Sequence, residues 1–548
     1  MHVLQIHPSD NVLVALEDLP AGTVVHHDGA AYTLPEPVSA KHKFVTRTLA
    51  PGDPIYMYGV LVGVATQPIA AGAPISQANV AQAAQDYEQR QGPATWTPPD
   101  VSRWRDRTFL GYHRTDGQVG TANHWLVIPL VFCENRNVEV LKEAFEKELG
   151  YARPEVYRAE VAELVRRYRQ GAGPDELLEA ALEAPASATT PTPLFDHVDG
   201  IRFLTHQGGC GGTREDACSL CGLLAGYIHH PNVAGATILS LGCQNAQVEM
   251  LQEALYARNP RFDKPLLIFE QQRSRSEHAM LTEAIRQTFV GLVRANALER
   301  RPAPLHHLTL GVECGGSDGF SGISANPAIG HAADLLVALG GTVLLSEFPE
   351  LCGVEQELIN RCVTPALGER FAALMRAYAA RAEAVGSGFD MNPSPGNIRD
   401  GLITDAMKSA GAVRKGGTSP VTAVLDYPEY ATEKGLNLLC TPGNDVESTT
   451  ALTGAGASVI LFSTGLGTPT GNPITPVLKI ASNSALARRM PDIIDLDSGP
   501  IIRGEKTIEQ VGEEILEQVI QTASGAYVPK AVRLGQHDFI PWKRGVSL

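Results

Sequence analysis

The residues best suited to chemistry lie in one stretch, residues 311–331, which reads GVECGGSDGFSGISANPAIGH. It follows the apolar run LTLGV, which is typical of a buried strand. Its glycines let the backbone approach a ligand closely, and its Cys, Ser, Asp, Asn and His side chains supply hydrogen-bonding groups and metal ligands. We interpret the stretch as the floor of an active site. The alternative is an ordinary glycine-rich turn between a strand and a helix.

Three cysteines occupy the same kind of position. Cys210 follows the run IRFLTH, Cys243 follows ATILSLG, and Cys314 follows LTLGV. Such runs, each followed by a glycine-rich turn and a helix, indicate an α/β sheet, in which ligands gather at the carboxyl ends of the strands. If the strands are neighbours, the three thiols and His206 meet and can hold iron, zinc or an iron–sulfur cluster. The alternative is that the cysteines fill the core.

The chain of 548 residues is too long for one hydrophobic core. Residues 1–85 contain short alternating runs separated by turn residues, which predicts a small β-rich domain. Residues 86–105 are polar and proline-rich and are interpreted as a linker. Residues 106–300 and 305–548 alternate strands, glycine-rich turns and helices. The predicted fold class is therefore α/β, with two α/β domains whose sheets are largely parallel.

The composition excludes several classes of protein. A formal net charge of −15 argues against nucleic acid or an anionic membrane as the main partner, and no apolar run reaches the length of a membrane span. The nine cysteines and the lack of an export signal favour reduced thiols and a cytoplasmic location. No dinucleotide-binding or P-loop fingerprint is present, which disfavours a nicotinamide-dependent dehydrogenase.

Basic and polar side chains elsewhere are candidates for binding an anion. His42 and Lys43 form a basic pair on the small β domain of an acidic chain, and such a pair can hold a carboxylate. The alternative is a solvated surface charge. Arg114 and Asn123 lie in a glycine-containing turn that precedes the apolar run WLVIPLVF. Several polar Gly/Pro loops in the C-terminal half exceed what simple connections need.

The motifs ECGGSDGFSGISANPAIGH, NPSPGN, CTPGND, FSTGLGTP and SDNV…HKF…YG together resemble the altronate/galactarate dehydratase family, over nearly the whole chain. The phrases NVLVAL with PAGT, and LNLLCTPGND with SVILFSTG, are closer to its altronate branch. Two loops depart from the family pattern. One reads GLGTPTG where many members have a basic residue and an aromatic, and the other reads HQGGCGG where HxYGC is expected. The resemblance implies that residues 1–85 form a β-clip domain of the SAF type.

The resemblance also implies a sugar-acid dehydratase. The expected reaction converts D-altronate to 2-dehydro-3-deoxy-D-gluconate and water, by metal-assisted abstraction of the C2 proton and loss of the 3-hydroxyl. The implied cofactor is iron, as Fe²⁺ or within an iron–sulfur cluster, and another divalent cation can replace it in a crystal. The implied partner is a small sugar acid, without nucleic acid or membrane, and we expect a homo-oligomer, a dimer.

Roles for individual residues follow from the resemblance and the patterns together. The predicted metal ligands are Cys210, Cys243, Cys314 and His206. The predicted acid and base come from His42, His206 and Asp318. The predicted substrate-binding residues are Lys43, Arg114, Asn123, Ser317, Asn326, Asn397 and Thr468.

Two other functions compete with this interpretation. The first is galactarate dehydratase or a lyase acting on a related hydroxy acid such as a sulfolactate. The second, from a different class, is a sugar-acid-binding protein that has kept the loops and lost the metal. Turnover measured on a panel of acids distinguishes the first alternative from altronate dehydration, and metal analysis distinguishes the second.

Overall fold

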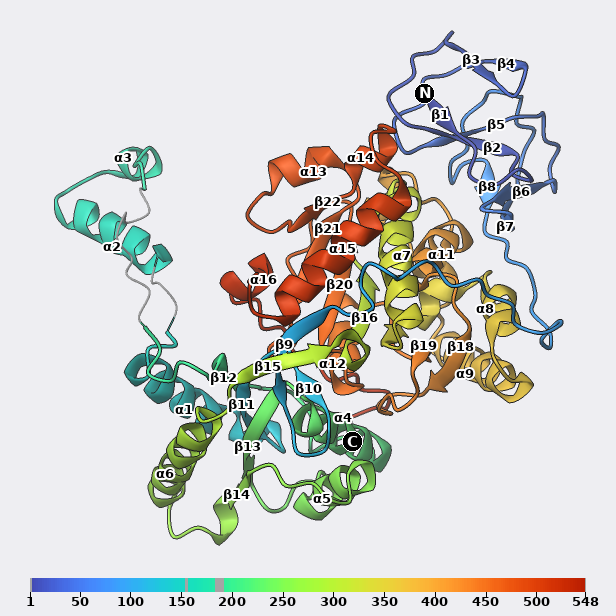
Figure 1. Cartoon of the computed structure of the whole chain (residues 1–548). Coiled ribbons are helices and arrows are strands. Elements are labelled where there is room, and N and C mark those ends of the chain that lie inside the picture. The colour runs from blue at the N-terminus through green and yellow to red at the C-terminus, as the bar shows by residue number, and fades with distance from the viewer. Residues whose placement is uncertain (1, 153–155, 183–191, 548) are drawn as a thin grey trace.

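The computed structural model describes residues 2–152, 156–182 and 192–547, which form an N-terminal β domain and two α/β domains (Figure 1). The N-terminal domain contains three small antiparallel sheets, β1-β2-β5, β3-β4 and β6-β7-β8. Its strands are β1 (Val3–Leu4), β2 (Val12–Ala15), β3 (Val24–His27), β4 (Ala30–Thr33), β5 (Lys43–Val45), β6 (Pro54–Met57), β7 (Val60–Ala65) and β8 (Val80–Ala81). The predicted β-rich module is confirmed.

Residues 86–105 contain no helix or strand and cross the surface of the C-terminal domain. The Trp96 indole nitrogen donates a hydrogen bond to Thr418 Oγ1 at 3.2 Å, and the backbone nitrogen of Glu88 donates to Gln356 Oε1 at 2.7 Å. This extended segment therefore lies against the protein rather than hanging free.

The central domain is built on a four-stranded parallel sheet of order β12-β11-β13-β14. Its strands are β11 (His124–Pro129), β12 (Gly200–Phe203), β13 (Val233–Ser240) and β14 (Leu266–Glu270). The helices are α1 (Asn135–Glu148), α4 (Arg214–His229), α5 (Val248–Arg258) and α6 (Glu277–Ala295). A small antiparallel sheet joins β9 (Thr108–His113), β10 (Val119–Gly120) and β15 (Arg300–Pro304), and helices α2 (Val156–Arg169) and α3 (Pro174–Leu178) stand away from the body (Figure 1).

The C-terminal domain is built on a seven-stranded sheet of order β18-β19-β17-β16-β20-β21-β22, in which every neighbouring pair is parallel. The strands are β16 (Thr309–Cys314), β17 (Thr342–Leu345), β18 (Val421–Leu425), β19 (Gly435–Leu439), β20 (Val459–Thr464), β21 (Val477–Ala481) and β22 (Leu496–Asp497). The helices are α7 (Ala325–Ala338), α8 (Glu355–Arg361), α9 (Pro365–Glu383), α10 (Pro395–Arg399), α11 (Asp405–Ala412), α12 (Asp445–Gly454), α13 (Ser484–Arg489), α14 (Gly499–Ile502), α15 (Ile508–Ala523) and α16 (Lys530–Arg533). The predicted α/β class with parallel sheets is confirmed.

The two faces of the seven-stranded sheet have different neighbours. Leu310 and Val312 belong to the core that also contains residues of α7 and α15, whereas Ile460 and Phe462 belong to the core shared with α4 and α12. Side chains alternate between the faces of a strand, so Cys314 and Glu313 point to opposite sides of β16. Parallel strands end at the same edge, and this carboxyl edge therefore collects the loops that follow β16, β17, β19, β20 and β21.

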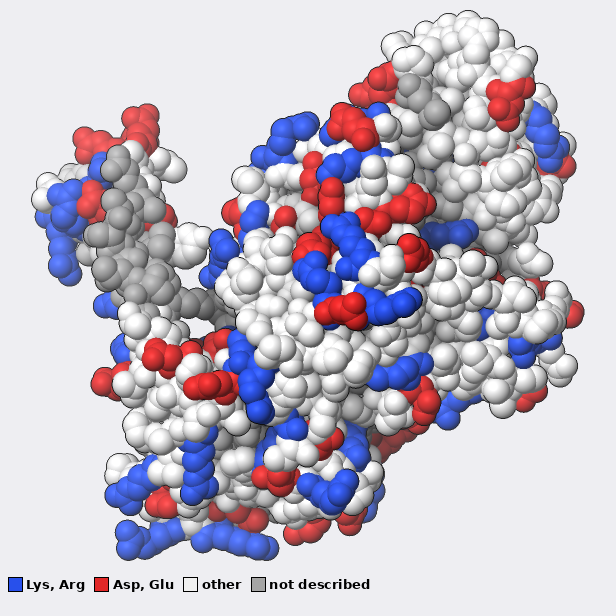
Figure 2. All heavy atoms as spheres, in the orientation of Figure 1, with Lys and Arg blue, Asp and Glu red and all other residues white. Residues whose placement is uncertain are grey.

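The charged side chains agree with the composition. Figure 2 shows Lys and Arg intermixed with Asp and Glu over the displayed face, without a broad basic surface. Among the described residues, none of the helices is both long enough and apolar enough to span a bilayer.

Helix α4 of the central domain packs directly on α12 of the C-terminal domain. A Cβ at Gly226 would lie 2.1 Å from the carbonyl oxygen of Gly454, so only glycine allows the two backbones to approach this closely. We expect Gly226→Ala to lower the free energy of unfolding by about 2 to 3 kcal/mol, because backbone atoms cannot move aside as a flexible side chain can.

Chemical denaturation measures this change. Gly212→Ala is the matched control, since a Cβ there meets its nearest atom at an ordinary 3.5 Å and the change should be small. Equal stabilities of the two variants would contradict the proposed close contact.

Candidate active site

A buried cluster of charged groups and a thiol lies at the carboxyl edge of the seven-stranded sheet. We call it the Cys314 cluster; it consists of Glu313, Cys314, Glu347, Glu350, Lys408 and Lys415. The Lys415 ammonium donates to Glu347 Oε2 at 2.5 Å and to Cys314 Sγ at 3.0 Å. Lys408 Nζ lies 2.6 Å from Glu350 Oε1, and the Cys314 thiol donates to Glu350 Oε2 at 3.2 Å. Two ammonium groups thus balance two carboxylates in a buried site.

The charges in this cluster are set by burial and by its own members. Burial and the adjacent Glu347 and Glu350 raise the pKa of Cys314 well above its usual value, so the thiol is neutral and can donate. Burial lowers the pKa of Lys415, but the attraction of the carboxylates Glu347 and Glu350 outweighs burial and the net shift is upward. Burial, with Glu347, raises the pKa of Glu313, whose Oε2 accepts hydrogen bonds from two serine hydroxyls.

Glu347 is held in a strained backbone conformation. Its φ of 65° and ψ of 59° are left-handed, which costs a non-glycine residue about 1 to 2 kcal/mol. Thr441 Oγ1 accepts a hydrogen bond from the Glu347 nitrogen at 2.8 Å and fixes the turn. The strain aims the carboxylate at Cys314, whose backbone nitrogen donates to Glu347 Oε2 at 3.2 Å.

Cys314, Glu347 and Glu350 form a candidate metal site. One ligand atom from each lies within 4.8 Å of the others, and no second group of three such donors occurs in the described ranges. One thiolate and two carboxylates, with positions left open for substrate, fit a divalent transition metal. Lys408 and Lys415 now hold these donors, so a bound cation would replace their ammonium contacts.

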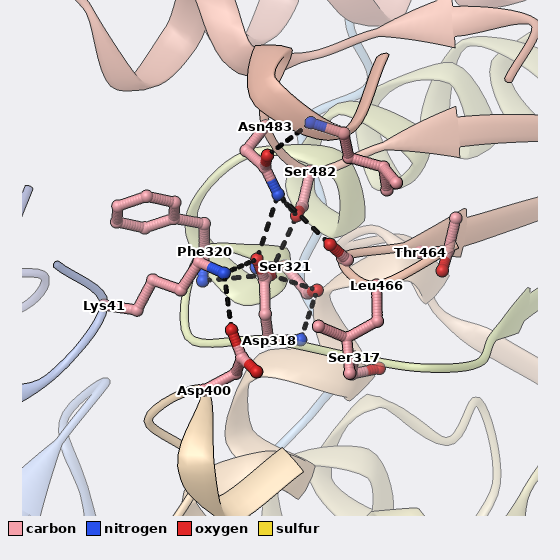
Figure 3. Close-up of polar contacts among 12 residues, drawn as sticks. Lys41, Ser317, Asp318, Phe320, Ser321, Asp400, Thr464, Leu466, Ser482 and Asn483 are labelled. Atoms are coloured by element: carbon pink, nitrogen blue, oxygen red, sulfur yellow. Dashed lines mark hydrogen bonds and ion pairs between the residues drawn. The ribbon is translucent and has the colours of Figure 1, made fainter. Parts of the chain in front are cut away.

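Asp318 lies at the centre of a second cluster (Figure 3). Its Oδ1 accepts hydrogen bonds from Phe320 N, from the nitrogen and hydroxyl of Ser321, and from the hydroxyl of Ser482. Its Oδ2 accepts from Asn483 Nδ2 at 3.1 Å and lies 3.1 Å from the Lys41 ammonium. A carboxylate with so many partners has no oxygen free to take a proton, so this geometry fits an anchor and not the predicted acid or base.

The N-terminal domain reaches this second cluster through consecutive residues. Lys41 also donates to Asp400 Oδ1 at 2.7 Å, and a ring nitrogen of His42 lies 3.0 Å from the carbonyl oxygen of Arg399. The buried Lys43 ammonium donates to the carbonyl oxygen of Gly401 at 2.7 Å. Burial lowers the pKa of Lys43 to about 7, against the opposing charge of Asp318. The basic segment therefore docks one domain on another, and His42 and Lys43 both bind backbone in this arrangement.

The remaining predicted residues of the C-terminal domain surround the same loops. Asn397 donates to the carbonyl oxygen of Ser317 at 2.8 Å, and the Ser317 hydroxyl is buried without a hydrogen-bond partner. Asn326 donates to Gly411 O and accepts from the Ser463 hydroxyl, which fixes the start of α7. Thr468 donates its backbone nitrogen to Thr464 Oγ1 at 3.1 Å, leaving its half-buried side chain beside Gly316. Of these four residues, Ser317 and Thr468 are the two whose side chains are available to bind a ligand.

The structure does not bring the three predicted thiols and His206 together. Cys210 and Cys243 are exposed on neighbouring loops of the central domain, joined by a hydrogen bond from Ala246 N to Gly209 O at 3.0 Å. Cys314 is buried in the other α/β domain, and the three-donor group contains neither of the other thiols. The strands belong to two separate sheets, so the carboxyl ends that carry the cysteines do not share one edge.

His206 has a structural role in this geometry. Its Nε2 lies 2.7 Å from the carbonyl oxygen of Pro129, and its Nδ1 accepts a hydrogen bond from Gly208 N at 3.1 Å. Burial lowers the pKa of His206, which favours the neutral ring that these two contacts require. Neither nitrogen is therefore left to bind a metal or to move a proton, which are the two roles that the sequence predicted for His206.

Arg114 and Asn123 lie away from the predicted site. Arg114 is buried and donates to the carbonyl oxygen of Pro231 at 2.7 Å and to Asn123 Oδ1 at 3.0 Å. Asn123 donates to the carbonyl oxygen of His197 at 2.7 Å. Both residues come before β11, at the amino edge of the central sheet, whereas Cys210 follows a strand at the opposite edge. In this structure both side chains take part in packing.

A cleft of about 580 Å³ opens between the two α/β domains and is partly covered by the C-terminal tail. It is lined by His206, Cys210, Asn245, Glu447, Trp542 and Lys543, among others. A second cavity of about 570 Å³ shares Trp542 and Lys543 with it and reaches Asn392 and Gly443. Gly443 and Asn392 adjoin Glu350, so the second cavity leads toward the Cys314 cluster.

Several functional candidates escaped the sequence analysis. Glu347 and Glu350 stand directly after the apolar run TVLL, in the position that singled out the cysteines, but their carboxylates resemble ordinary surface charge in sequence. Lys408 and Lys415 lie in a short helix and the turn after it and carry no local signal. Lys479 interrupts the apolar strand VLKIA, and a charge inside such a strand is a signal that can be read from the sequence.

We expect Lys41→Ala to lower the free energy of unfolding by about 3 kcal/mol, because it leaves the buried Asp318 charge without its ammonium partner. Arg47→Ala, in the same domain, removes an exposed ion pair with Asp53 at 3.9 Å and should cost less than about 1 kcal/mol. Urea denaturation, together with limited proteolysis after the N-terminal domain, measures both. Equal effects of the two substitutions would refute the anchoring role of Lys41.

Comparison with known proteins agrees with this architecture. Residues 1–83 match the altronate/galactarate dehydratase SAF domain, residues 111–296 the second domain of D-galactarate dehydratase/altronate hydrolase, and residues 305–547 the C-terminal domain of D-galactarate/altronate dehydratase. The chain is 34% identical to altronate dehydratase of Escherichia coli (strain K12) over 526 residues, 96% of each chain. It is 31% identical to altronate dehydratase of Bacillus subtilis (strain 168) over 525 residues, 96% of this chain and 95% of the relative. It is 28% identical to the L-threo-forming galactarate dehydratase of Escherichia coli (strain K12) over 540 residues, 98% and 95% of the two chains. The chain belongs to the altronate/galactarate dehydratase family of hydro-lyases.

Proposed function

We propose that this enzyme dehydrates D-altronate to 2-dehydro-3-deoxy-D-gluconate. The observation that carries the proposal is the 34% identity with an altronate dehydratase over 96% of both chains. The buried Cys314 cluster at the carboxyl edge of the large sheet supports it, because such an edge is where ligands bind in α/β proteins.

The reaction needs three contributions. The C2 proton is only weakly acidic, so a base must take it and the negative charge that develops on the carboxylate must be stabilised. The 3-hydroxyl is a poor leaving group and needs a proton as it departs. Lys408 and Lys415 are buried cations beside the cluster, and buried cations stabilise developing negative charge more strongly than cations in water do.

We further propose that Cys314, Glu347 and Glu350 hold iron. A bound Fe²⁺ would supply Lewis-acid stabilisation of the substrate carboxylate and hydroxyl oxygens. The support is the donor set, which combines one soft sulfur with two carboxylates. The protein's own contribution is to hold these donors in place, through the Thr441 contact to Glu347 and the buried lysines.

The substrate would enter through the cleft between the α/β domains. Arg381, Lys543 and Arg544 line the cavity that leads toward Glu350 and can attract an anionic sugar acid. The sugar hydroxyls would meet Ser317 and Thr468 on the loops after β16 and β20. Asn326 and Asn397 would hold these loops in shape through their backbone contacts.

All nine cysteines are free in the structure, which supports the expected reducing, cytoplasmic location. We also propose that the protein forms a homodimer.

A panel of sugar acids tests the assigned substrate. We expect kcat/KM for D-altronate to exceed that for galactarate and for a sulfolactate by at least tenfold, measured by 2-keto-acid formation with Fe²⁺ under reducing conditions. A higher kcat/KM for galactarate than for D-altronate would instead assign the enzyme to the galactarate branch of the family. Binding of sugar acids without turnover, and without rescue by Fe²⁺, would favour a binding protein.

Metal analysis of variants tests the ligand set. We expect Cys314→Ser and Glu350→Gln to lose at least tenfold in iron affinity, because each removes one of three donors. Cys210→Ser and Cys243→Ser are matched thiol controls and should keep full iron content. The opposite pattern would place the metal on the exposed loops of the central domain.

A further inference from the structure

One carboxylate at the carboxyl edge of the large sheet differs from those of the two clusters described above. Glu313, Glu347, Glu350 and Asp318 each have hydrogen bonds or ion pairs. The Asp445 side chain has no hydrogen bond or ion pair with any described residue. It is half-buried at the first position of α12, directly after the helix cap Asn444, whose side chain accepts from two backbone nitrogens. Unlike those four carboxylates, Asp445 is free to exchange a proton.

Asp445 lies directly over the backbone that follows Cys314. A Cβ at Gly315 would lie 2.1 Å from Asp445 Oδ2 and 2.6 Å from the ring atom Cζ of Phe462. Only glycine leaves room for both groups at this position. The carboxyl group of Asp445 and the edge of the Phe462 ring therefore both lie against the backbone next to Cys314.

Lys479 approaches the same ring from the next strand. Glu313, Phe462 and Lys479 are register partners on β16, β20 and β21, so their side chains form a row on one face of the sheet. The Lys479 ammonium lies 3.6 Å from the centre of the Phe462 ring, is fully buried, and has no hydrogen-bond partner. A buried ammonium without a partner is costly and indicates a group kept for function.

Asp445 and Lys479 influence each other without forming an ion pair. No carboxylate oxygen of a described residue lies within 4.0 Å of the Lys479 ammonium, although the charges of Asp445, Asp495, Asp538 and Glu313 act on it. Burial lowers the pKa of Lys479 to about 7, against the attraction of Asp445. Burial, with Glu347 and Glu350, raises the pKa of Asp445 to about 7, and Lys479 opposes this rise. The attraction between the two groups therefore favours the charged form of each.

We propose that Asp445 is the catalytic base that takes the C2 proton of the sugar acid, and that Lys479 is a positioning residue that keeps the Asp445 carboxylate charged and aimed across Phe462. This inference rests on the proposed dehydratase function. It also replaces the predicted acid–base residues His206 and Asp318, whose nitrogen and oxygen atoms are already occupied.

The proposed step balances without any oxidant or reductant. The Asp445 carboxylate forms an O–H bond with the C2 proton, and the C2–H electron pair becomes the C2–C3 double bond. The C3–O bond breaks, and its electron pair leaves with the hydroxyl group, which takes a proton from solvent and departs as water, while the proton on Asp445 is later returned to solvent. The enol product then becomes the 2-keto acid by proton transfer.

Kinetics of Asp445→Asn, Lys479→Met and Asp538→Asn test the inference on the acid that the wild-type enzyme turns over. We expect Asp445→Asn to lower kcat by 10²- to 10⁴-fold with KM changed less than threefold, the range typical of a lost general base. Lys479→Met should lower kcat by at least tenfold, again with little change in KM. Asp538 also acts on Lys479 through its charge but accepts a hydrogen bond from Gly471 N, and its variant should stay within threefold of wild type.

Chemical rescue separates a proton-transfer role from a structural one. Added formate should restore Asp445→Ser by at least tenfold, and added ethylamine should restore Lys479→Ala, whereas a folding defect would respond to neither. Asp445→Asn with more than one tenth of wild-type kcat, or no rescue of Asp445→Ser by formate, would overturn the inference. A wild-type enzyme that turns over none of the sugar acids would instead refute the proposed function.

Discussion

The structure depends on the pairing of two buried lysines with two buried carboxylates beneath Cys314. Removing charges from water is expensive, and attraction between them compensates only when each has a well-placed partner. Lys415 with Glu347 and Lys408 with Glu350 meet this condition at 2.5 and 2.6 Å. The parallel strands, the strained turn at Glu347 and the short helix α11 all serve to hold these four side chains together. A fold that needed only a core would fill this volume with apolar side chains.

The other two domains complete this centre in different ways. The N-terminal domain inserts Lys41 between Asp318 and Asp400, and so clamps the loop that begins at Cys314 (Figure 3). The central domain packs α4 on α12, which places its loops on one side of a cleft that Glu447 of α12 and the C-terminal tail also line. The C-terminal tail then connects both sides, since the nitrogen of Arg544 binds Asp216 of the central domain while its guanidinium binds Asp426. The site is thus a product of all three domains, although its charged centre belongs to one.

The sequence was informative about elements and less so about geometry. Apolar runs followed by glycine-rich turns predicted the parallel sheets, and the stretch from Gly311 to His331 does lie at a strand end beside the buried cluster. The grouping of Cys210 with Cys314 was wrong because strand ends in separate sheets look alike in sequence. Arg114 was misplaced because a polar turn before a strand contains the same residue types as a polar turn after it. The two turns nevertheless lie at opposite edges of the sheet. Lys408 and Lys415 could not be found, since only tertiary packing shows that these two lysines are buried.

In our proposal, the buried donors beneath Cys314, and not the exposed thiols of the central domain, form the catalytic metal centre. Anomalous diffraction at the iron edge, from crystals of the protein loaded with Fe²⁺ and a sugar acid, tests it most directly. We expect one iron peak bonded to Cys314 Sγ and to carboxylate oxygens of Glu347 and Glu350, with the acid bound beside Asp445. A peak bonded to Cys210 or Cys243, with the Cys314 cluster still closed by its lysines, would contradict it.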